Sequence, residues 1–273
     1  MAVATARTND RGFALLVVLW TLVLLALIVT ELGTSGRMES KIARNLMTNA
    51  TAEAAADGAV HQAIFHLADS SDQGWQADSL PRHLSVGAVP VDVRIDDESG
   101  KVNPNLADPV LIQSLLVVLG ADQNLAQTLT QGIVDWRGGN PPEQQSTIVQ
   151  RYQAAGLKYQ PSFSPFESVD DVGLVIDMPP ALAILLEPHL SVHQIGIADP
   201  ARADPVVARA LAQMPGATGF ATPAVPMAYH SVTITAAAHM PEGGEFTRRA
   251  VVRIGPGLPR GYAVLVWDTP AGS

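Results

Sequence analysis

The first quarter of the chain carries the pattern of one long helix. Residues 13–30 read FALLVVLWTLVLLALIVT, eighteen positions without a charged side chain. At about 1.5 Å per residue this stretch would span about 27 Å, close to the hydrocarbon thickness of a bilayer. Between Thr34 and Ala68 there is no proline, and apolar residues recur at helical spacing: Met38, Ile42, Leu46, Val60, Ile64 and Leu67. The pattern predicts one helix from Phe13 to about Ala68, roughly 84 Å long, apolar in its first half and amphipathic in its second.

Beyond this helix, the sequence predicts strands on either side of a helical block. Residues 69–81 are polar and turn-rich, which indicates a loop. Alternation from Val86 to Ile95 predicts a strand with one buried face, then a tight turn at 96–100 and the start of a second strand at 101–103. After residue 190 the period of two returns, and strands are expected at 230–237, 246–254 and 262–267, the first two forming a hairpin.

The block between these strands reads as short helices. Asp108 followed by Pro109 is a typical N-cap and first-turn pair, and Gly120 ends that helix. Ser168 with Asp171 resembles a capping box. Helices are expected at 109–119, 123–136, 143–155, 169–176 and 180–186. A helical block between strands of one sheet predicts an insertion into an α+β domain.

Composition narrows the possible functions. The 273 residues include 17 bases and 26 acids, so the net charge is −9 and the pI is near 5.1. A nucleic-acid-binding protein needs a basic stripe to neutralise phosphates, and this balance argues against one. The lack of cysteine excludes zinc ribbons, thiol catalysis and disulfides. Hydrophobic residues make up 47% of the chain and charged ones only 16%, and the surplus lies largely in residues 13–30.

Three interpretations of residues 13–30 compete. A secretory signal peptide would be shorter and would end in a small-x-small cleavage site, whereas this segment runs directly into Glu31 and a polar helix. A buried core helix rarely extends this far without a polar face. A retained signal anchor fits best. The positive-inside rule then places Arg7 and Arg11 in the cytoplasm and the chain after Thr30 outside it.

The start of the chain also carries a processing signal. A basic leader ends in Gly12-Phe13, an apolar helix starts there and an amphipathic helix continues it, which resembles the class III leader of type IV pilins and pseudopilins. The resemblance implies that a prepilin peptidase cuts between Gly12 and Phe13 and methylates the new N-terminus. Residues 1–12 would be the leader, 13–30 the transmembrane segment and 31–68 the amphipathic continuation. The mature charge would be −10, because the leader carries two bases and one acid.

One position departs from most pilins. They carry a glutamate at the fifth mature position, which pairs with the N-terminal amine of a neighbour, and here that position is Val17. A charge missing from the membrane interior costs a single subunit little, but the usual docking partner is lost. The family member known for lacking this glutamate is the minor pseudopilin K of type II secretion.

The helical block resembles the same family more specifically. Four ordered segments are similar to its motifs: 97–105 (DESGKVNPN) to D-E-S-G-K-[IL]-N-[LI]-N, 133–136 (IVDW) to I-x-D-W, 159–172 to Y-x-P…P-F-x-S-V-x-E-L, and 186–192 to the segment that closes the block. From Gly12 to about Val192 the chain therefore resembles the minor pseudopilin K family, also called general secretion pathway protein K. The C-terminal third matches only in being strand-rich.

This resemblance implies a fold, a location and partners. The fold would be α+β and pilin-like, with the long N-terminal helix packed on an antiparallel sheet. Residues 69–105 and 193–273 would form its β parts, and 106–192 a large inserted α-helical domain. The chain would cross the cell inner membrane once, with its N-terminus cytoplasmic and its C-terminal domain periplasmic. The implied partners are other minor pseudopilins in a hetero-oligomeric complex at the pseudopilus tip, the major pseudopilin, the prepilin peptidase and the inner membrane.

No residues suggest catalysis, and the chain is not expected to be an enzyme. The seven histidines form no H-E-x-x-H pattern, and no G-x-S-x-G elbow or Walker-type loop occurs. The acid cluster at 96–98 is interpreted as a solvated turn. Some relatives bind calcium in acidic loops, but residues 137–140 read RGGN here, a poor oxygen-donor set for a hard cation. No metal and no cofactor is therefore expected.

Alternative functions stay open. A minor type IV pilin of a motility or adhesion fibre shares the leader but lacks the helical-block motifs. A membrane-anchored DNA-uptake protein is suggested by a weak repeat, ADPV at 107–110 and again at 203–206, each opening a short helix like half of a helix-hairpin-helix unit. Apart from Arg209, neither copy carries the bases that a phosphate site needs. A membrane-tethered periplasmic enzyme has no supporting constellation.

Overall fold

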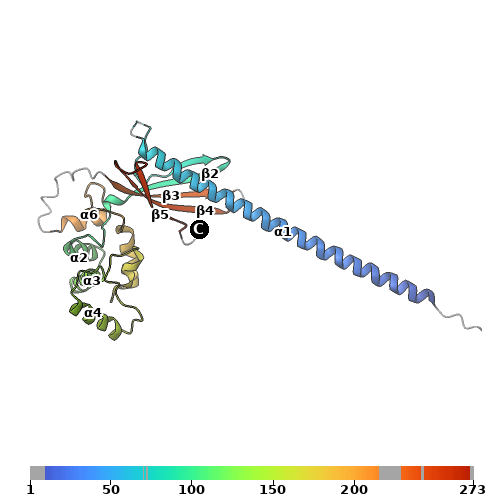
Figure 1. The fold of residues 1–273 in the computed structure, drawn as a ribbon, viewed down its shortest axis with the longest axis horizontal. Coiled ribbons are helices and arrows are strands. Elements are labelled where there is room, and N and C mark those ends of the chain that lie inside the picture. The colour runs from blue at the N-terminus through green and yellow to red at the C-terminus, as the bar shows by residue number, and fades with distance from the viewer. Residues whose placement is uncertain (1–9, 70, 72, 215–228, 241–242, 271–273) are drawn as a thin grey trace, which may run out of the picture.

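One long helix sets the shape of the protein (Figure 1). The computed structural model describes residues 10–69, 71, 73–214, 229–240 and 243–270, apart from the side chains of 10–12 and 30–37. Helix α1 spans Asp10–Ala68 without a break, which confirms the predicted continuous helix, although it begins before Phe13. Its C-terminal part lies on a sheet, and its N-terminal part projects away from the rest of the chain (Figure 1).

The sheet has five antiparallel strands in the order β1-β2-β3-β4-β5. They span Arg82–Val86, Val89–Asp97, His230–His239, Glu245–Ile254 and Tyr262–Asp268. The predicted C-terminal strands and the β3–β4 hairpin are confirmed. β2 pairs with β3, placing Val93 opposite Ala236, although the helical block separates these strands in the sequence. The block is therefore inserted between neighbouring strands of one antiparallel sheet, as predicted.

One strand prediction was wrong, and another strand begins later than predicted. The predicted strand from Val86 is part of a hairpin, in which β1 and β2 meet at a turn whose Gly87 has a φ of 61°, a conformation that glycine adopts readily. Residues 101–103 form no strand. The 3-10 turn η1 (Glu98–Gly100) redirects the chain into the helical block, and Val102 then makes only an isolated parallel bridge to Leu190.

Small residues bring α1 close to the sheet. The buried face of the helix consists of Ala52, Ala55, Ala56, Ala59, Val60, Ala63 and Ile64. Alternate residues of a strand point to opposite faces, and those of the central strands that point to α1, such as Val93 and Ile234, are fully buried. Alanine adds little side-chain bulk, so the helix axis approaches the sheet closely along this face. The alanine-rich half of the helix is thus the half that the sheet covers.

The inserted helices enclose a second core near one end of the sheet (Figure 1). The helices are α2 (Pro109–Val118), α3 (Gln123–Trp136), α4 (Pro142–Ala154), α5 (Pro180–Leu186) and α6 (Pro205–Ala212). The predicted helices match to about one residue, except that 169–176 is a 3-10 turn, η2 (Asp170–Leu174). A further 3-10 turn, η3 (Glu187–His189), follows α5. α6 packs on α2 in the same core, so the helical body extends past the predicted boundary at residue 192.

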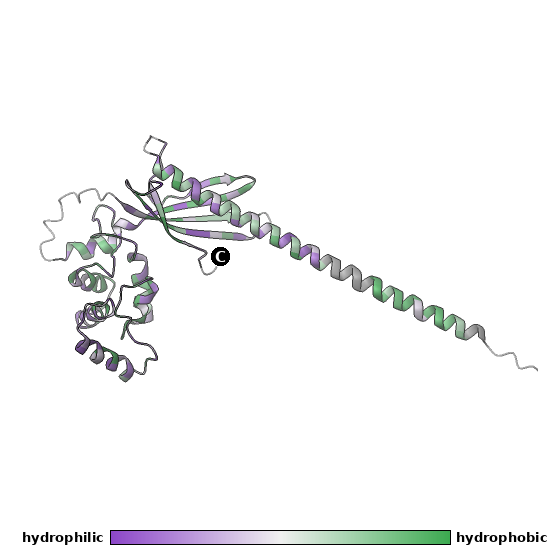
Figure 2. Cartoon of the chain, in the orientation of Figure 1, coloured by the Kyte–Doolittle hydropathy of each residue, from purple (hydrophilic) through white to green (hydrophobic). Residues whose placement is uncertain are grey.

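Hydropathy divides α1 into two parts. Figure 2 shows a nearly continuous hydrophobic stretch on its projecting half. Among the residues that the structure describes, no helix combines the length and the apolarity needed to cross a membrane.

Candidate assembly site

The predicted processing site lies in the first turns of α1. Gly12 and Phe13 are both helical, and the Phe13 side chain is 73% exposed. This end of the helix projects away from the sheet and the inserted helices (Figure 1). The site is therefore accessible to another protein, while cleavage after Gly12 and methylation of Phe13 stay predictions.

The projecting half of α1 exposes apolar side chains all around the helix. Every side chain from Phe13 to Val29 is exposed, including that of Val17. No residue from 13 to 29 is an aspartate or a glutamate. Farther along the helix, four more large apolar side chains are exposed: Met38, Ile42, Leu46 and Met47. Burial of apolar surface contributes about 25 cal/mol per Å². An uncovered apolar surface of this extent marks contact with lipid or with another protein.

Arg248 attaches the other half of α1 to the sheet. It lies on β4, and its side chain is only 9% exposed. Its guanidinium donates to Asp57 Oδ1 and to Glu53 Oε1, both on α1, at 2.6 Å. The same group lies 5.6 Å from the ring centroid of Trp267, within cation–π range. Burial by itself would lower the pKa of Arg248, but the hydrogen bonds and charges of Asp57 and Glu53 raise it above its ordinary value.

Sequence reasoning missed this three-residue contact. The available signals were two acids four positions apart on an alanine-rich helix, Glu53 and Asp57, and one base in a buried strand, Arg248. Neither signal reveals its partner, because the residues lie almost two hundred positions apart and meet only when α1 packs on β4.

The DESGK segment ties the inserted domain to the sheet. Asp97, at the end of β2, accepts a hydrogen bond from the Ser99 amide at 2.8 Å and forms an ion pair with Arg202. Gly100 lies close to the backbone of a distant segment, since a Cβ there would lie 2.2 Å from the Arg202 carbonyl oxygen. The glycine is therefore required by packing against the segment that precedes α6.

Glu98 is buried at this junction, with 3% exposure. Its Oε1 accepts a hydrogen bond from Lys101 Nζ at 2.8 Å and another from Thr233 Oγ1 of β3 at 2.7 Å. Buried carboxylates are stable when they are paired in this way. The interpretation of residues 96–98 as a solvated turn was therefore wrong for Glu98, because the inserted domain and β3 close over it.

The following residues, VNPN, connect the two ends of the insertion. The Val102 carbonyl oxygen accepts from the Ser191 amide at 3.0 Å, and Asn103 Nδ2 donates to the Gln194 carbonyl at 2.5 Å. Asn105 forms a pair of hydrogen bonds with the backbone of Phe166, at 2.7 and 3.0 Å. Segments that lie far apart in the sequence thus meet within one hydrogen-bonded junction.

The D-W motif belongs to the same structure. Trp136, at the end of α3, stacks on Phe166 with ring centroids 5.8 Å apart and planes at 6°. Asp135 is 6% exposed and accepts from Gln131 Nε2 at 2.7 Å. The motifs that suggested a family by resemblance therefore converge on one scaffold that holds the helical domain together.

The loop after the D-W motif has a structural role. Arg137 donates to the carbonyl oxygens of Pro104 and Ala107, each at 2.9 Å, and burial lowers its pKa. Gly138 has a φ of 91°, and a Cβ there would lie 2.6 Å from the Phe163 carbonyl oxygen. Within the described part of the chain, no group of three or more His, Asp or Glu residues could hold a metal ion.

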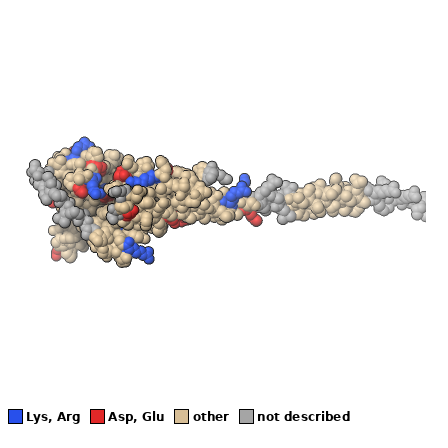
Figure 3. Space-filling view, turned by 90° about the horizontal axis from the view of Figure 1, so that it is seen from above, with Lys and Arg blue, Asp and Glu red and all other residues tan. Residues whose placement is uncertain are grey.

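The weak internal repeat forms two adjacent capped helices. Asp108 accepts from the Val110 amide at 2.8 Å to cap α2, and Asp204 accepts from the Val206 amide at 2.7 Å to cap α6. The two helices pack against each other in the core. Figure 3 shows bases and acids interspersed over the visible face of the protein, with no continuous basic stripe there. The repeat therefore reads as two similarly capped core helices.

The comparisons with known proteins agree with this architecture. Residues 91–194 match the family model described as type II secretion system (T2SS), protein K. The fold is similar to that of a chain in the crystal structure of the GspK–GspI–GspJ complex from the enterotoxigenic Escherichia coli type 2 secretion system. That match has a TM-score of 0.59 and 14% identity, and covers 86% of this chain and 98% of the other. No curated protein matches the chain.

The matched region begins in β2 and contains the junction residues from Asp97 to Gln194, but not Arg202 or Thr233. The family match of this segment and the match of the fold both lead to proteins of the type II secretion system. The protein K model that matches residues 91–194 is the one that the sequence resemblance predicted.

Proposed function

We propose that this chain is a minor pseudopilin, a membrane-anchored, non-enzymatic subunit that assembles at the tip of the periplasmic pseudopilus, which drives protein export across the outer membrane. The observation that carries the proposal is the division of α1. Its C-terminal half is fixed to the sheet through Arg248, whereas its N-terminal half leaves apolar side chains uncovered. Such an exposed apolar surface on half of a helix indicates contact with a membrane or with another protein.

We infer that the inner membrane covers residues 13–30 before assembly. The support is the eighteen-residue uncharged run and the exposure of each described side chain in it. Anchoring stays a prediction, because no helix among the described residues meets the length and apolarity of a membrane span. Arg7 and Arg11 would stay in the cytoplasm, and the pilin-like domain would lie in the periplasm.

Prepilin peptidase processing would create the mature N-terminus at Phe13. The glycine at position 12 and the exposed start of α1 support this step. N-terminal mass spectrometry of the membrane-extracted protein should find a methylated Phe13 as the first residue. An intact start at Met1 would contradict this processing.

The proposed partners are other minor pseudopilins, the major pseudopilin and the peptidase. The similar solved structure is a complex of GspK with GspI and GspJ, which supports a hetero-oligomer for this chain. A subunit at the tip is favoured by the inserted domain, which extends from one end of the sheet and would obstruct a subunit stacked above it (Figure 1). Val17 also offers no carboxylate to a neighbour's N-terminal amine.

Cross-linking tests the position in the fibre. The chain has no cysteine, so a single cysteine at Val17 can be cross-linked without interference from native thiols. A tip subunit should form cross-links to other minor pseudopilins. Cross-links between two copies of this subunit should be absent. Repeated links between copies of this subunit along the fibre would refute the tip position.

A further inference from the structure

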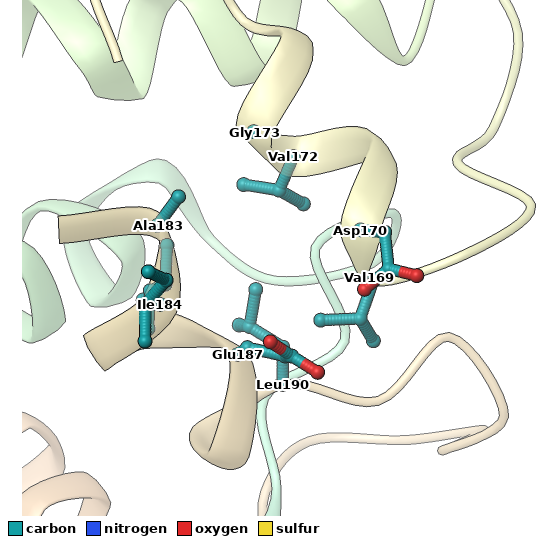
Figure 4. A pocket seen from close by; sticks show the side chains of 9 residues that line it. Val169, Asp170, Val172, Gly173, Ala183, Ile184, Glu187 and Leu190 are labelled. Carbon is teal, nitrogen blue, oxygen red and sulfur yellow. The ribbon is translucent and has the colours of Figure 1, made fainter. Parts of the chain in front are cut away.

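A small pocket on the inserted domain combines apolar walls with two carboxylates (Figure 4). It encloses about 190 Å³ between η2 and α5. Its apolar walls come from Val169, Val172, Ala183, Ile184, Leu186 and Leu190. Ala183 and Ile184 lie on one side of the pocket and Asp170 on the other (Figure 4). The interior therefore suits an aliphatic chain rather than a polar ligand.

The charged residues that line this pocket are both acids, Asp170 and Glu187. Both are exposed, and neither carboxylate forms an ion pair within the described part of the chain. Figure 4 shows Asp170 beside Val169, and Glu187 beside Leu190. The neighbouring base Arg249 is hydrogen-bonded to both oxygens of Asp268, at 2.6 and 3.0 Å, and its pKa is raised mainly by that pair and further by the charges of Asp170 and Glu98. The two carboxylates thus remain available to a cation from outside.

A larger groove continues from the pocket toward the sheet. It has a volume of about 740 Å³ and shares Val169, Asp170, Glu187 and Leu190 with the pocket. Its lining includes residues of β3, β4 and β5, so it follows the junction between the sheet and the inserted domain. The bases Lys101 and Arg249 and the acid Glu98 also line it. The groove offers room for the backbone of an extended segment whose side chain enters the pocket.

We propose that this pocket binds an arginine or lysine side chain presented by an extended segment of another protein. The methylene stem would lie against the apolar walls, and the charged head would reach the carboxylates of Asp170 and Glu187 at the pocket's edge. Long basic side chains bury their stems along apolar surface while the charged end stays at a polar rim. Charge-assisted hydrogen bonds to carboxylates then orient the head.

We place the cation on another chain. The residues outside the description that follow the inserted helices, 215–228, contain no lysine or arginine, and neither do 241–242 or 271–273. The net charge of −9 makes a basic segment of a partner electrostatically complementary to this protein as a whole. This inference concerns the helical domain and does not depend on membrane anchoring or on a place at the tip.

Labelled peptides can test the pocket on the full chain in detergent. The probe is a fluorescein-labelled peptide, Gly-Ser-Leu-Arg-Leu-Ser-Gly, blocked at both ends. The control is the same peptide with citrulline in place of arginine. Citrulline keeps the length and shape of the side chain but is neutral. Fluorescence polarisation should show binding of the arginine peptide that weakens as salt is added, and about tenfold weaker binding of the citrulline peptide.

Two kinds of variant separate charge from shape. The double variant Asp170→Asn/Glu187→Gln removes both charges and should weaken binding of the arginine peptide to the level of the citrulline peptide. Gly173→Leu should abolish binding with the charges intact, because a Cβ at Gly173 meets only the Ala183 Cβ, at 3.8 Å, and a longer side chain would fill the pocket. Thermal unfolding of each variant verifies that it folds.

A matched control removes two charges elsewhere on the same domain. Glu143 and Asp177 are exposed, and neither lines the pocket. Asp177 has a φ of 65°, a conformation that asparagine tolerates well, so Glu143→Gln/Asp177→Asn should fold and bind like the parent chain. Equal binding of the arginine and citrulline peptides would overturn the proposal. So would unchanged binding by a folded Gly173→Leu chain, or no binding of either peptide at millimolar concentration.

Discussion

Replacing Arg248 should loosen α1 from the sheet. The guanidinium joins two acids of α1 to the middle of β4, with both contacts at 2.6 Å and with 9% exposure of the arginine side chain. Arg248→Ala removes both ionic hydrogen bonds and the contact with the ring of Trp267. The change leaves Glu53 and Asp57 without their cation.

The decrease in the free energy of unfolding depends on how well water can hydrate the two acids once the arginine is removed. A hydrogen bond to a charged group contributes about 1.5–3 kcal/mol, and a cation–π contact about 0.5–2 kcal/mol. The side chains of Glu53 and Asp57 are 53% and 33% exposed, so water can hydrate them once Arg248 is gone. The penalty should therefore stay below that of a fully buried orphan charge. We expect a loss of about 2–4 kcal/mol in the free energy of unfolding.

The adjacent arginine provides a matched control. Arg249 forms a comparable pair with Asp268, but both side chains are more than a third exposed. Exposed pairs contribute about 0–1 kcal/mol, so Arg249→Ala should cost at most that amount. Urea unfolding of the full chain in detergent, followed by circular dichroism, measures both losses. Spin labels on single introduced cysteines in α1 and β4 report directly whether the helix leaves the sheet.

Equal losses for Arg248→Ala and Arg249→Ala would refute the reasoning. A second measurement distinguishes ionic pairing from simple packing. In an Arg248→Met background, neutralising the acids with Glu53→Gln and Asp57→Asn should recover part of the lost stability, because no unpaired charge then remains near the apolar face. No recovery would show that packing, not pairing, fixes the helix.

Two further predictions concern the junction and its pH dependence. Gly100→Ala should cost about 1–3 kcal/mol, because its Cβ would lie 2.2 Å from the Arg202 carbonyl oxygen. The matched change Gly173→Ala, whose Cβ would make only an ordinary contact with the Ala183 Cβ at 3.8 Å, should change the free energy of unfolding in urea by less than about 1 kcal/mol. Equal effects of the two changes would contradict the close contact at Gly100. Burial would raise the pKa of Asp204, but hydrogen bonds from His189 and from the α6 amides lower it. The folded state is therefore stabilised above the unfolded-state pKa, near about 3.9, and loses this contribution as pH falls through the lower folded-state value. The stability gap between the parent chain and Asp204→Asn should narrow as pH falls from about 5 to about 2, and a constant gap would exclude this linkage.

Local patterns predicted most of the helices correctly. The unbroken run without proline predicted α1, and the Asp-Pro starts with glycine stops predicted α2 and its neighbours. Helix hydrogen bonds and caps connect residues a few positions apart, so their signals stand close together in the sequence. The family resemblance also rested on such short segments, and the comparisons confirmed it.

Strands and buried charges were harder to predict, because their partners lie far away in the sequence. β1 is a short edge strand whose pattern runs into β2, and only pairing across the Gly87 turn separates the two. Residues 101–103 alternate like a strand but find no sheet partner, because η1 turns the chain into the insertion. Pairing partners distant in the sequence decide such elements.

The chain pattern was sufficient for the long helix, the order of elements, the division of α1 into apolar and alanine-rich halves, and the motifs of protein K. The burial of Glu98, the attachment of α1 through Arg248, and the pocket beside Asp170 and Glu187 emerged only in the folded chain. Periodicity records which face of an element avoids water. It does not record which distant side chain will meet a charge there, because that depends on how the elements pack against one another.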